Sequence, residues 1–257
     1  MAESRLIEQM QESTLIFDGA MGTLIYSRGV FINRCFEEIS LSNPDLVIDI
    51  HEEYINAGAQ VLETNTFGAN RIKLSRHGIA ENVEAINRKS VELALQAAEK
   101  SEAMVVGSVG PCLLPGQMLS PDNETEVREA FAEQIGILAD AGVQGLLLET
   151  FTNLEEARLA LEGAEKTDLP VILSFAFAEG ARTPQGAEIE QVIAELDQDE
   201  RVDVIGLNCG AGPAPVYDAF ERARVMSQKP FLIQPNAGNP REIDGRMLYL
   251  ATPEYYT

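Results

Sequence analysis

The sequence predicts an α/β fold, a (β/α)8 TIM-type barrel whose last βα unit is missing from this chain. Seven short apolar runs alternate with amphipathic stretches along the chain. Each run is a nearly continuous series of Leu or β-branched residues, which is typical of a strand covered on both faces in a parallel sheet. The segment after the first run, DGAMGT, lacks the GxGxxG fingerprint of a dinucleotide-binding sheet, so the serial βα units favour a closed barrel.

The predicted strands are short, and the stretches between them are long enough to hold a crossover helix. They cover residues 14–18, 60–64, 103–109, 145–150, 171–174, 204–208 and 231–235. No low-complexity tract or domain linker interrupts the series. We therefore expect residues 1–257 to form one barrel domain that is incomplete at its C-terminal end.

The stretches between the runs have recognisable helix ends. Asn43 and Pro44 supply an N-cap and a first-turn proline, and Gly58 ends that helix. Thr152 and Glu155 have the spacing of a capping box. Further amphipathic helices are predicted over residues 81–100, 125–141 and 187–196.

The series is one strand short of an eight-stranded barrel. Thr252 and Pro253 resemble the N-cap and first turn of another helix, so the chain stops where a helix begins. We expect the chain to be a fragment or a truncation that lacks the eighth βα unit.

The chain is strongly acidic. Lys and Arg number 19 and Asp and Glu 41, which gives a formal net charge of −22 and a pI near 4.4. This charge repels phosphate backbones and anionic lipid, and it argues against nucleic acid and membrane surfaces as partners. No apolar run approaches the ~18 residues of a spanning helix, and the N-terminus lacks the pattern of a signal peptide.

The cysteines and histidines limit the kinds of site that the chain can build. Cys35, Cys112 and Cys209 are odd in number and far apart, which excludes a disulfide framework and predicts a reducing, cytoplasmic location. His51 falls in a predicted helix and His77 in a predicted turn. Two histidines so placed cannot build a His-rich zinc site.

The working residues of such barrels lie at the C-terminal ends of the strands and in the loops that follow. Thr150, Ser174 and Gln234 stand at such ends. The candidates for substrate binding at these positions are Asp18, Gly19, Thr66, Ser108, Glu149, Asn208 and Asn236.

Three of the strand-end residues carry reactive groups. Cys209 is the candidate metal ligand, because it ends a strand where a soft metal or an electrophile could reach its thiol. The alternative is that Cys209 packs as a small core residue, as most lone cysteines do. Asp18 and Glu149 could clamp a substrate ammonium group or act as an acid/base pair, or they could brace loops.

Six motifs, in order along the chain, resemble the homocysteine S-methyltransferase family. They are DGAMGT (18–23), GVFINRCFEE (29–38), HEEYINAGAQVLETNTFGAN (51–70), GSVGP (107–111), GLNCGAGP (206–213) and QPNAGNP (234–240). The FINRC stretch most resembles bacterial two-domain proteins that join this module to a methylenetetrahydrofolate reductase. The likeness runs from about Leu15 to the C-terminus.

The resemblance implies a (β/α)8 barrel that holds Zn²⁺ with three cysteines, one in a GxNC motif and two in a GGCCG motif on the last strand. Cys209 matches the first motif, and the pair would lie in the eighth unit, which this chain lacks. Bound to zinc, the homocysteine thiol, with a free pKa of about 8.5, stays a nucleophilic thiolate. The resemblance also assigns Asp18 and Glu149 to the amino-acid end of homocysteine.

The implied function is methyl transfer to homocysteine, forming methionine. The donor stays open between methylcobalamin on a corrinoid protein, methyltetrahydrofolate and S-methylmethionine, and a C-terminal folate or reductase domain is a second candidate partner. With Cys209 as its one ligand, we expect the 257-residue chain to be inactive alone.

Two alternatives stay open. A metal-independent lyase or aldolase needs a Schiff-base lysine at a strand end, but the lysines considered fall in helices or loops. These are Lys73, Lys89, Lys100, Lys166 and Lys229. The other alternative is a truncated or inactive barrel that binds homocysteine or a partner domain without turnover.

Overall fold

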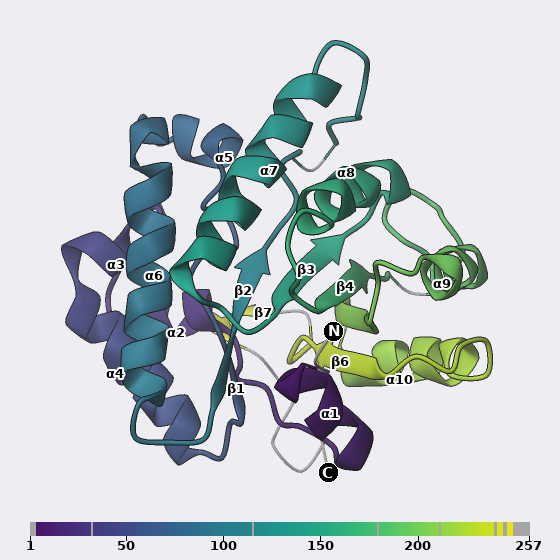
Figure 1. Cartoon of the computed structure of the whole chain (residues 1–257), viewed down its shortest axis with the longest axis horizontal. Coiled ribbons are helices and arrows are strands. Elements are labelled where there is room, and N and C mark those ends of the chain that lie inside the picture. The colour runs from purple at the N-terminus through teal and green to yellow at the C-terminus, as the bar shows by residue number, and fades with distance from the viewer. Residues whose placement is uncertain are drawn as a thin grey trace. The chain divides into compact units, whose positions relative to one another are not determined.

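The computed structural model describes residues 4–31, 33–114, 116–178, 180–210, 212–238, 241–243 and 246–248. Strands alternate with helical segments from β1 to β6 (Figure 1). The strands are β1 (Val61–Glu63), β2 (Met104–Val109), β3 (Leu146–Phe151), β4 (Val171–Ala176), β5 (Val204–Cys209), β6 (Phe231–Pro235), β7 (Arg241–Ile243) and β8 (Arg246–Leu248).

Helices occupy the five stretches that the sequence predicts as helical, and further helices lie outside these stretches. The helices are α1 (Arg5–Glu12), α2 (Met21–Ser27), α3 (Ile39–Ser42), α4 (Pro44–Asn56), α5 (Arg71–Ser75), the 3₁₀ turn η1 (Ala80–Asn82), α6 (Val83–Ala98), α7 (Glu124–Ala141), α8 (Leu154–Ala164), α9 (Ile189–Gln198) and α10 (Pro213–Ala223). None of the described helices is both long and apolar enough to cross a membrane.

The chain divides into two compact units. The first comprises Met1–Leu147 and Arg158–Val171, and the second comprises Leu148–Ala157 and Ile172–Thr257. Strands β1 to β6 follow one another in chain order in one six-stranded sheet. Six of the seven predicted strands are thereby confirmed, with ends that differ from the predicted ones by at most two residues.

The first predicted strand, residues 14–18, is the exception. Only Phe17 forms a β-bridge, in parallel with Val61. The reason lies at Asp18, whose carboxylate oxygens both accept the backbone N–H of Glu63 at 3.1 Å. A side chain thus takes the ladder position that a main-chain carbonyl would fill, and regular pairing ends after one residue.

In the first unit, β1 and β2 pair in parallel, with Val61 opposite Met104. Helix α6 packs beside α4 and α7 (Figure 1). Part of the core lies between α2, α3, α4 and α6, where the buried apolar residues are Ile25, Ile39, Val47, Ile50 and Leu93. Packing of this kind fixes α4, which carries two residues of the site described below.

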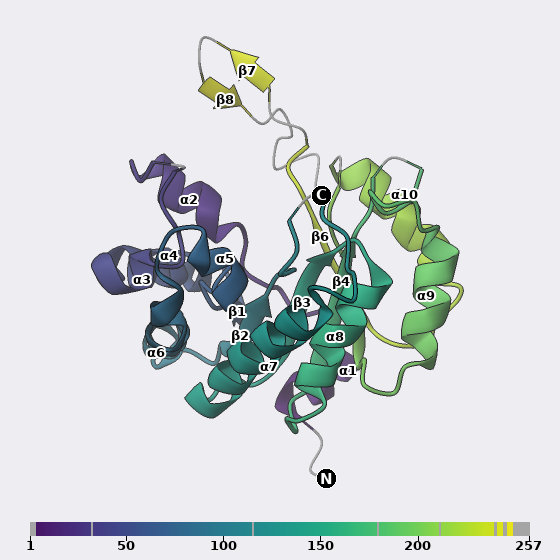
Figure 2. The ribbon, with the colours of Figure 1, turned by 90° about the horizontal axis from the view of Figure 1, so that it is seen from above.

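In the second unit, β4, β5 and β6 are parallel neighbours, and Ser174 lies opposite Gly206. Helices α9 and α10 lie side by side (Figure 2). Phe151 and Phe175 contribute a buried aromatic pair with ring centroids 6.4 Å apart. Strands β7 and β8 form an antiparallel pair that the sequence analysis does not predict.

Helix ends depart from prediction at α8. The cap is Asn153, whose Oδ1 accepts the backbone N–H groups of Glu155 at 2.7 Å and Glu156 at 3.0 Å. The prediction of Thr152 as the cap was wrong by one residue, because Asn caps at least as well as Thr and stands one position closer to the first turn. Thr252 and Pro253 lie outside the described residues.

Candidate functional site

The candidate residues of the first unit gather at the carboxyl ends of β1 and β2. Asp18 is 8% exposed and is held by the Glu63 backbone N–H. Gly19 follows it, and a Cβ added there would lie 3.0 Å from the Tyr54 hydroxyl. A glycine at this position therefore lets the backbone pass close to the Tyr54 ring beside the Asp18 carboxylate.

Tyr54 is a residue of this group that the sequence analysis does not single out. Its hydroxyl donates to the Ala20 carbonyl at 3.3 Å. Burial, together with the negative charges of Asp18, Glu63 and Glu53, raises the pKa of Tyr54 to about 12. The phenol is therefore neutral at physiological pH and lies in an acidic environment.

Thr66 and Ser108 are brought together, as neighbours on the ends of β1 and β2. The Thr66 hydroxyl donates to the Ser108 carbonyl at 2.7 Å and lies 2.6 Å from the Thr64 hydroxyl. The Thr64 hydroxyl accepts the Ser108 N–H at 3.1 Å. Thr66 is fully buried, so its hydroxyl ties the two strand ends together.

His51 also belongs to this group, one turn before Tyr54 on α4. Its ring is fully buried, and Nδ1 lies 3.9 Å from Asp18 Oδ2. Burial lowers the pKa of His51 to about 4, so the ring is neutral at physiological pH. A sequence reading could not detect this, because a lone histidine on a helix carries no signal of what it faces.

The depressed pKa of His51 predicts a stability that depends on pH. The folded value near 4 lies below the unfolded value of 6.5, so this contribution is complete above pH 6.5 and is lost as the pH falls toward 4. The full loss is about 3 kcal/mol of unfolding free energy. Urea unfolding at pH 7 and pH 4.5 should show a smaller loss for His51→Gln than for the wild type. The exposed His77→Gln is the control and should lose as much as the wild type.

The candidate residues of the second unit meet around Asn208, at the end of β5. Its Oδ1 accepts the Thr150 backbone N–H at 3.1 Å and the Ser174 hydroxyl at 2.8 Å. Its Nδ2 donates to Thr150 Oγ1 at 2.7 Å, and it approaches Glu149 Oε2 at 3.4 Å and Cys209 Sγ at 3.6 Å. Because a backbone N–H can only donate, the Thr150 contact fixes which end of the amide is oxygen.

Two residues that contact Asn208 have a strained backbone conformation. Thr150 has φ 63° and Cys209 has φ 59°, both in the left-handed region that residues other than glycine rarely adopt. Thr150 is β-branched, which makes this conformation costlier still. Strain of this kind persists where surrounding contacts hold it, and it is concentrated at functional sites.

Cys209 is the half-exposed thiol of this group. Its Sγ lies 3.9 Å from Thr150 Oγ1, and its carbonyl accepts the backbone N–H of Asn236 at 3.1 Å. Asn236 Nδ2 donates to the Gly210 carbonyl at 3.2 Å. Glu149, Asn208, Cys209 and Asn236 are thus connected within one unit, as their strand-end positions predict.

The three thiols differ in environment, which predicts their order of reaction. Cys112 is fully buried, and burial together with Glu37 raises the pKa of Cys35 to about 12. Iodoacetamide at pH 8 should therefore modify Cys209 at least about tenfold faster than either of the others. Peptide mass spectrometry would measure this, and Cys209→Ser should remove the early adduct. Early labelling of Cys35 or Cys112 in the folded protein would contradict the assignment.

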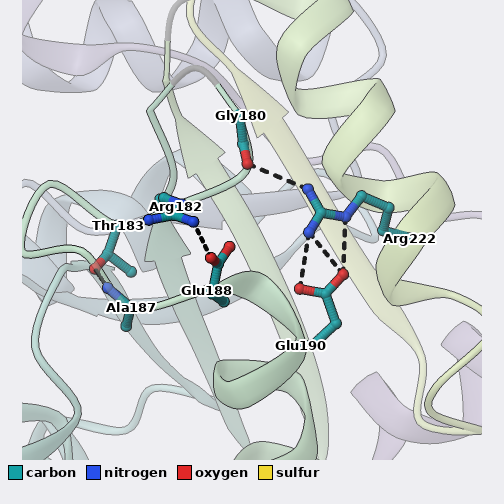
Figure 3. A network of polar contacts seen from close by, with 7 residues as sticks. All are labelled: Gly180, Arg182, Thr183, Ala187, Glu188, Glu190 and Arg222. Atoms are coloured by element: carbon teal, nitrogen blue, oxygen red, sulfur yellow. Dashed lines mark hydrogen bonds and ion pairs between the residues drawn. The ribbon is translucent and has the colours of Figure 1, made fainter.

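The loop that follows β4 is held in place by ion pairs within the second unit. Arg222 of α10 forms an ion pair with both carboxylate oxygens of Glu190, at 2.6 Å and 2.8 Å, and donates to the Gly180 carbonyl at 3.2 Å (Figure 3). Arg182 pairs with Glu188 at the base of the loop (Figure 3). Paired charges of this kind hold the loop between β4 and α9 to the first turn of α9 and to α10.

The described residues contain no group of three or more His, Cys, Asp or Glu side chains arranged to hold a metal ion. Cys209 has the exposure and the donor atom of a zinc ligand, and its thiol lies near the hydroxyl of Thr150 and the amide of Asn208. The same amide approaches the carboxylate of Glu149. These residues supply one thiol ligand and do not by themselves form a tetrahedral zinc site.

Comparison with known proteins identifies the family. The model of the family described as homocysteine S-methyltransferase matches residues 15–257. Methionine synthase of Mycobacterium leprae is 28% identical over 258 residues, which cover 93% of this chain and 21% of that protein. Homocysteine S-methyltransferase 1 of Arabidopsis thaliana is 26% identical over 249 residues, covering 87% of this chain and 76% of that protein.

A solved structure agrees with these matches. The homocysteine methyltransferase MmuM from Escherichia coli, in its metallated form, superposes with a TM-score of 0.80 at 25% identity, covering 90% of this chain and 86% of that one. This match confirms the α/β barrel class predicted from the sequence. The chain spans only about a fifth of the length of the methionine synthases that it matches, 21%. The chain belongs to the homocysteine S-methyltransferase family.

Proposed function

We propose that this chain binds L-homocysteine and presents its thiol to a methyl donor, so that methionine is formed. The observation that supports this most is the group around Asn208, where a half-exposed thiol, a carboxylate and two strained residues meet at the ends of β3 and β5. Family membership supplies the substrate class. The three free cysteines are consistent with a cytoplasmic location, which we also propose.

The proposed transfer is a single displacement. The sulfur of homocysteine attacks the methyl carbon in line, the sulfur–carbon bond forms, and the bond from carbon to the donor breaks with its electron pair left on the donor. The thiol proton is released to solvent or to a base. The thiol of homocysteine is largely protonated at neutral pH, because a free thiol has a pKa of about 8.5. The site therefore has to favour the thiolate form of the substrate.

We assign the residues of the chain to the two ends of the substrate. Glu149 and Asp18 are proposed to bind the ammonium group, because a carboxylate attracts a cation and each of the two is oriented by a neighbouring N–H group. Asn208 orients Glu149 and Cys209 through its Nδ2.

The roles proposed for the remaining candidates follow from their positions at strand ends and from the family to which the chain belongs. Gly19, Thr66, Ser108 and Asn236 are proposed to shape the substrate site at the strand ends. Cys209 is proposed as the zinc ligand of the chain, and zinc would favour the thiolate form of the substrate. The described residues do not complete that site, so no step of the transfer is assigned to the metal.

The first test separates substrate binding from turnover. Calorimetry with L-homocysteine should show binding by the wild-type chain, and Glu149→Gln should weaken it about a hundredfold, as loss of a charge-assisted contact does. The exposed Glu155→Gln on α8 is the matched control and should bind as the wild type does. Unchanged binding by Glu149→Gln would refute the assignment of Glu149.

The second test identifies the donor. Methionine formation is measured by mass spectrometry with S-methylmethionine, methylcobalamin or methyltetrahydrofolate, alone and with a corrinoid protein or a folate domain added. Transfer with one donor supports the proposal and names that donor. Homocysteine binding without transfer from any donor would favour the alternative, a barrel that binds its ligand without turnover.

A further inference from the structure

His51 is a buried histidine whose ring makes no hydrogen bond. The side chain is 0% exposed, and neither Nδ1 nor Nε2 has a hydrogen-bond partner among the described residues. Buried polar atoms are nearly always paired, so two orphaned nitrogens on one ring require a physical explanation. Packing alone would be served as well by an apolar residue, as it is at Val47 and Ile50 on the same helix.

The ring faces a carboxylate of the proposed substrate site. Nδ1 of His51 lies 3.9 Å from Oδ2 of Asp18, which is less than ~1 Å beyond hydrogen-bond range. The Asp18 side chain is 2% exposed, and its two oxygens accept the Glu63 N–H at 3.1 Å each. A small rotation of either side chain would bring the nitrogen into contact with the carboxylate.

The ring is neutral, so only one of its nitrogens can donate. The charges that raise the pKa of the adjacent Tyr54 are those of Asp18, Glu63 and Glu53, and all three are negative. Negative charges favour a protonated histidine, yet burial outweighs them and lowers the pKa of His51 to about 4. A neutral imidazole carries one N–H, and the nitrogen that bears it is set by the group that it faces.

We propose that His51 is a positioning residue for Asp18: the neutral ring carries its proton on Nδ1 and donates it to Oδ2 when the carboxylate binds the ammonium group of an amino-acid ligand. This inference rests on the proposed function, because it requires Asp18 to bind that ammonium. The Glu63 N–H holds the carboxylate from one element and His51 holds it from another. Two fixed contacts give the carboxylate one orientation toward the ligand.

Three substitutions distinguish positioning from packing. The amide nitrogen of Asn occupies the place of Nδ1, whereas that of Gln reaches the place of Nε2. Calorimetry with L-methionine, which has the amino-acid end of homocysteine and no thiol, should show about tenfold weaker binding for His51→Leu, the size expected for one hydrogen bond to a charged group. His51→Asn should restore binding to near the wild-type value, and His51→Gln should not.

A second measurement does not depend on ligand binding. Long-range ¹H–¹⁵N NMR of the histidine-labelled chain reports which ring nitrogen carries the proton, and the expected result for His51 is Nδ1. A proton on Nε2, or equal binding by the folded His51→Leu variant, would overturn the positioning role. Equal binding by His51→Asn and His51→Gln would also overturn it.

Asp18→Asn serves as the reference for the proposed function. If Asp18→Asn binds L-methionine as tightly as the wild type does, the ammonium assignment of Asp18 fails, and the positioning role fails with it. If Asp18→Asn weakens binding and His51→Leu does not, only the inference about His51 fails. Thermal unfolding of each variant shows whether the comparison is made between folded proteins.

Discussion

Asn208→Asp is expected to lower the free energy of unfolding by about 3 kcal/mol or more, because it buries an unpaired charge without changing the size of the side chain. Asn208 is 4% exposed, and its Nδ2 lies 2.7 Å from Thr150 Oγ1 and 3.4 Å from Glu149 Oε2. The substitution turns this donor into an acceptor that faces a carboxylate. Urea unfolding followed by circular dichroism measures the change.

The matched control for this substitution is Asn56→Asp at the exposed end of α4. It makes the same chemical change in water and should cost less than about 1 kcal/mol, mainly through the helix dipole. The repulsion also has a pH signature: the new carboxylate at position 208 has a raised folded pKa, so the loss should shrink as the pH falls. Equal losses of unfolding free energy for the two variants at pH 7 would show that the Asn208 amide makes no contact that stabilises the fold.

The sequence predicted the strands correctly where backbone groups alone form the hydrogen bonds between neighbouring strands. The runs that form β2 to β6 are continuous apolar segments. Such a segment is the pattern expected of a strand that is buried on both faces of a parallel sheet. The run at 14–18 has the same composition, but its ladder is ended by the side chain of Asp18. Composition does not record which side chain will substitute for a carbonyl, so this strand could not be distinguished from the others.

The strand-end positions of the candidate residues were predictable from the sequence, and their individual hydrogen bonds were not. The rule that chemistry follows strand ends selects Glu149, Asn208 and Cys209, which the structure does connect through hydrogen bonds. The rule does not show that Thr150 is strained or that Asn208 uses both ends of its amide, because these depend on distances across the sheet. His51 lies on a helix before β1 and is outside the reach of any rule about strand ends.

Gly206 links strand packing to the site. It lies opposite Ser174 in the β4–β5 register, and a Cβ added at Gly206 would lie 2.4 Å from the Cβ and 2.8 Å from the Cα of Ser174. The space left by the glycine is what admits Ser174, whose hydroxyl donates to Asn208 Oδ1 at 2.8 Å. The absence of a side chain at Gly206 therefore allows Ser174 to support the Asn208 amide, which contacts Cys209.

Gly206→Ala is accordingly expected to destabilise the protein by about 3 kcal/mol or more, since the clash involves backbone that cannot rotate away. The control is Gly136→Ala on α7, where an added Cβ meets nothing within 4 Å and a helical glycine is replaced by a better helix former. That variant should gain up to about 1 kcal/mol. Urea unfolding measures both changes.

A compensating substitution tests the stated cause. Ser174→Gly removes the nearest clash but leaves the contact with the Ser174 Cα, so Gly206→Ala combined with Ser174→Gly should recover part of the lost stability. It should not recover the function, because the hydroxyl that supports Asn208 is gone. Homocysteine binding by the double variant should therefore stay weak while its unfolding midpoint rises above that of Gly206→Ala. If stability and binding returned together, Ser174 would have no part in holding Asn208, and Gly206 would matter for strand packing alone.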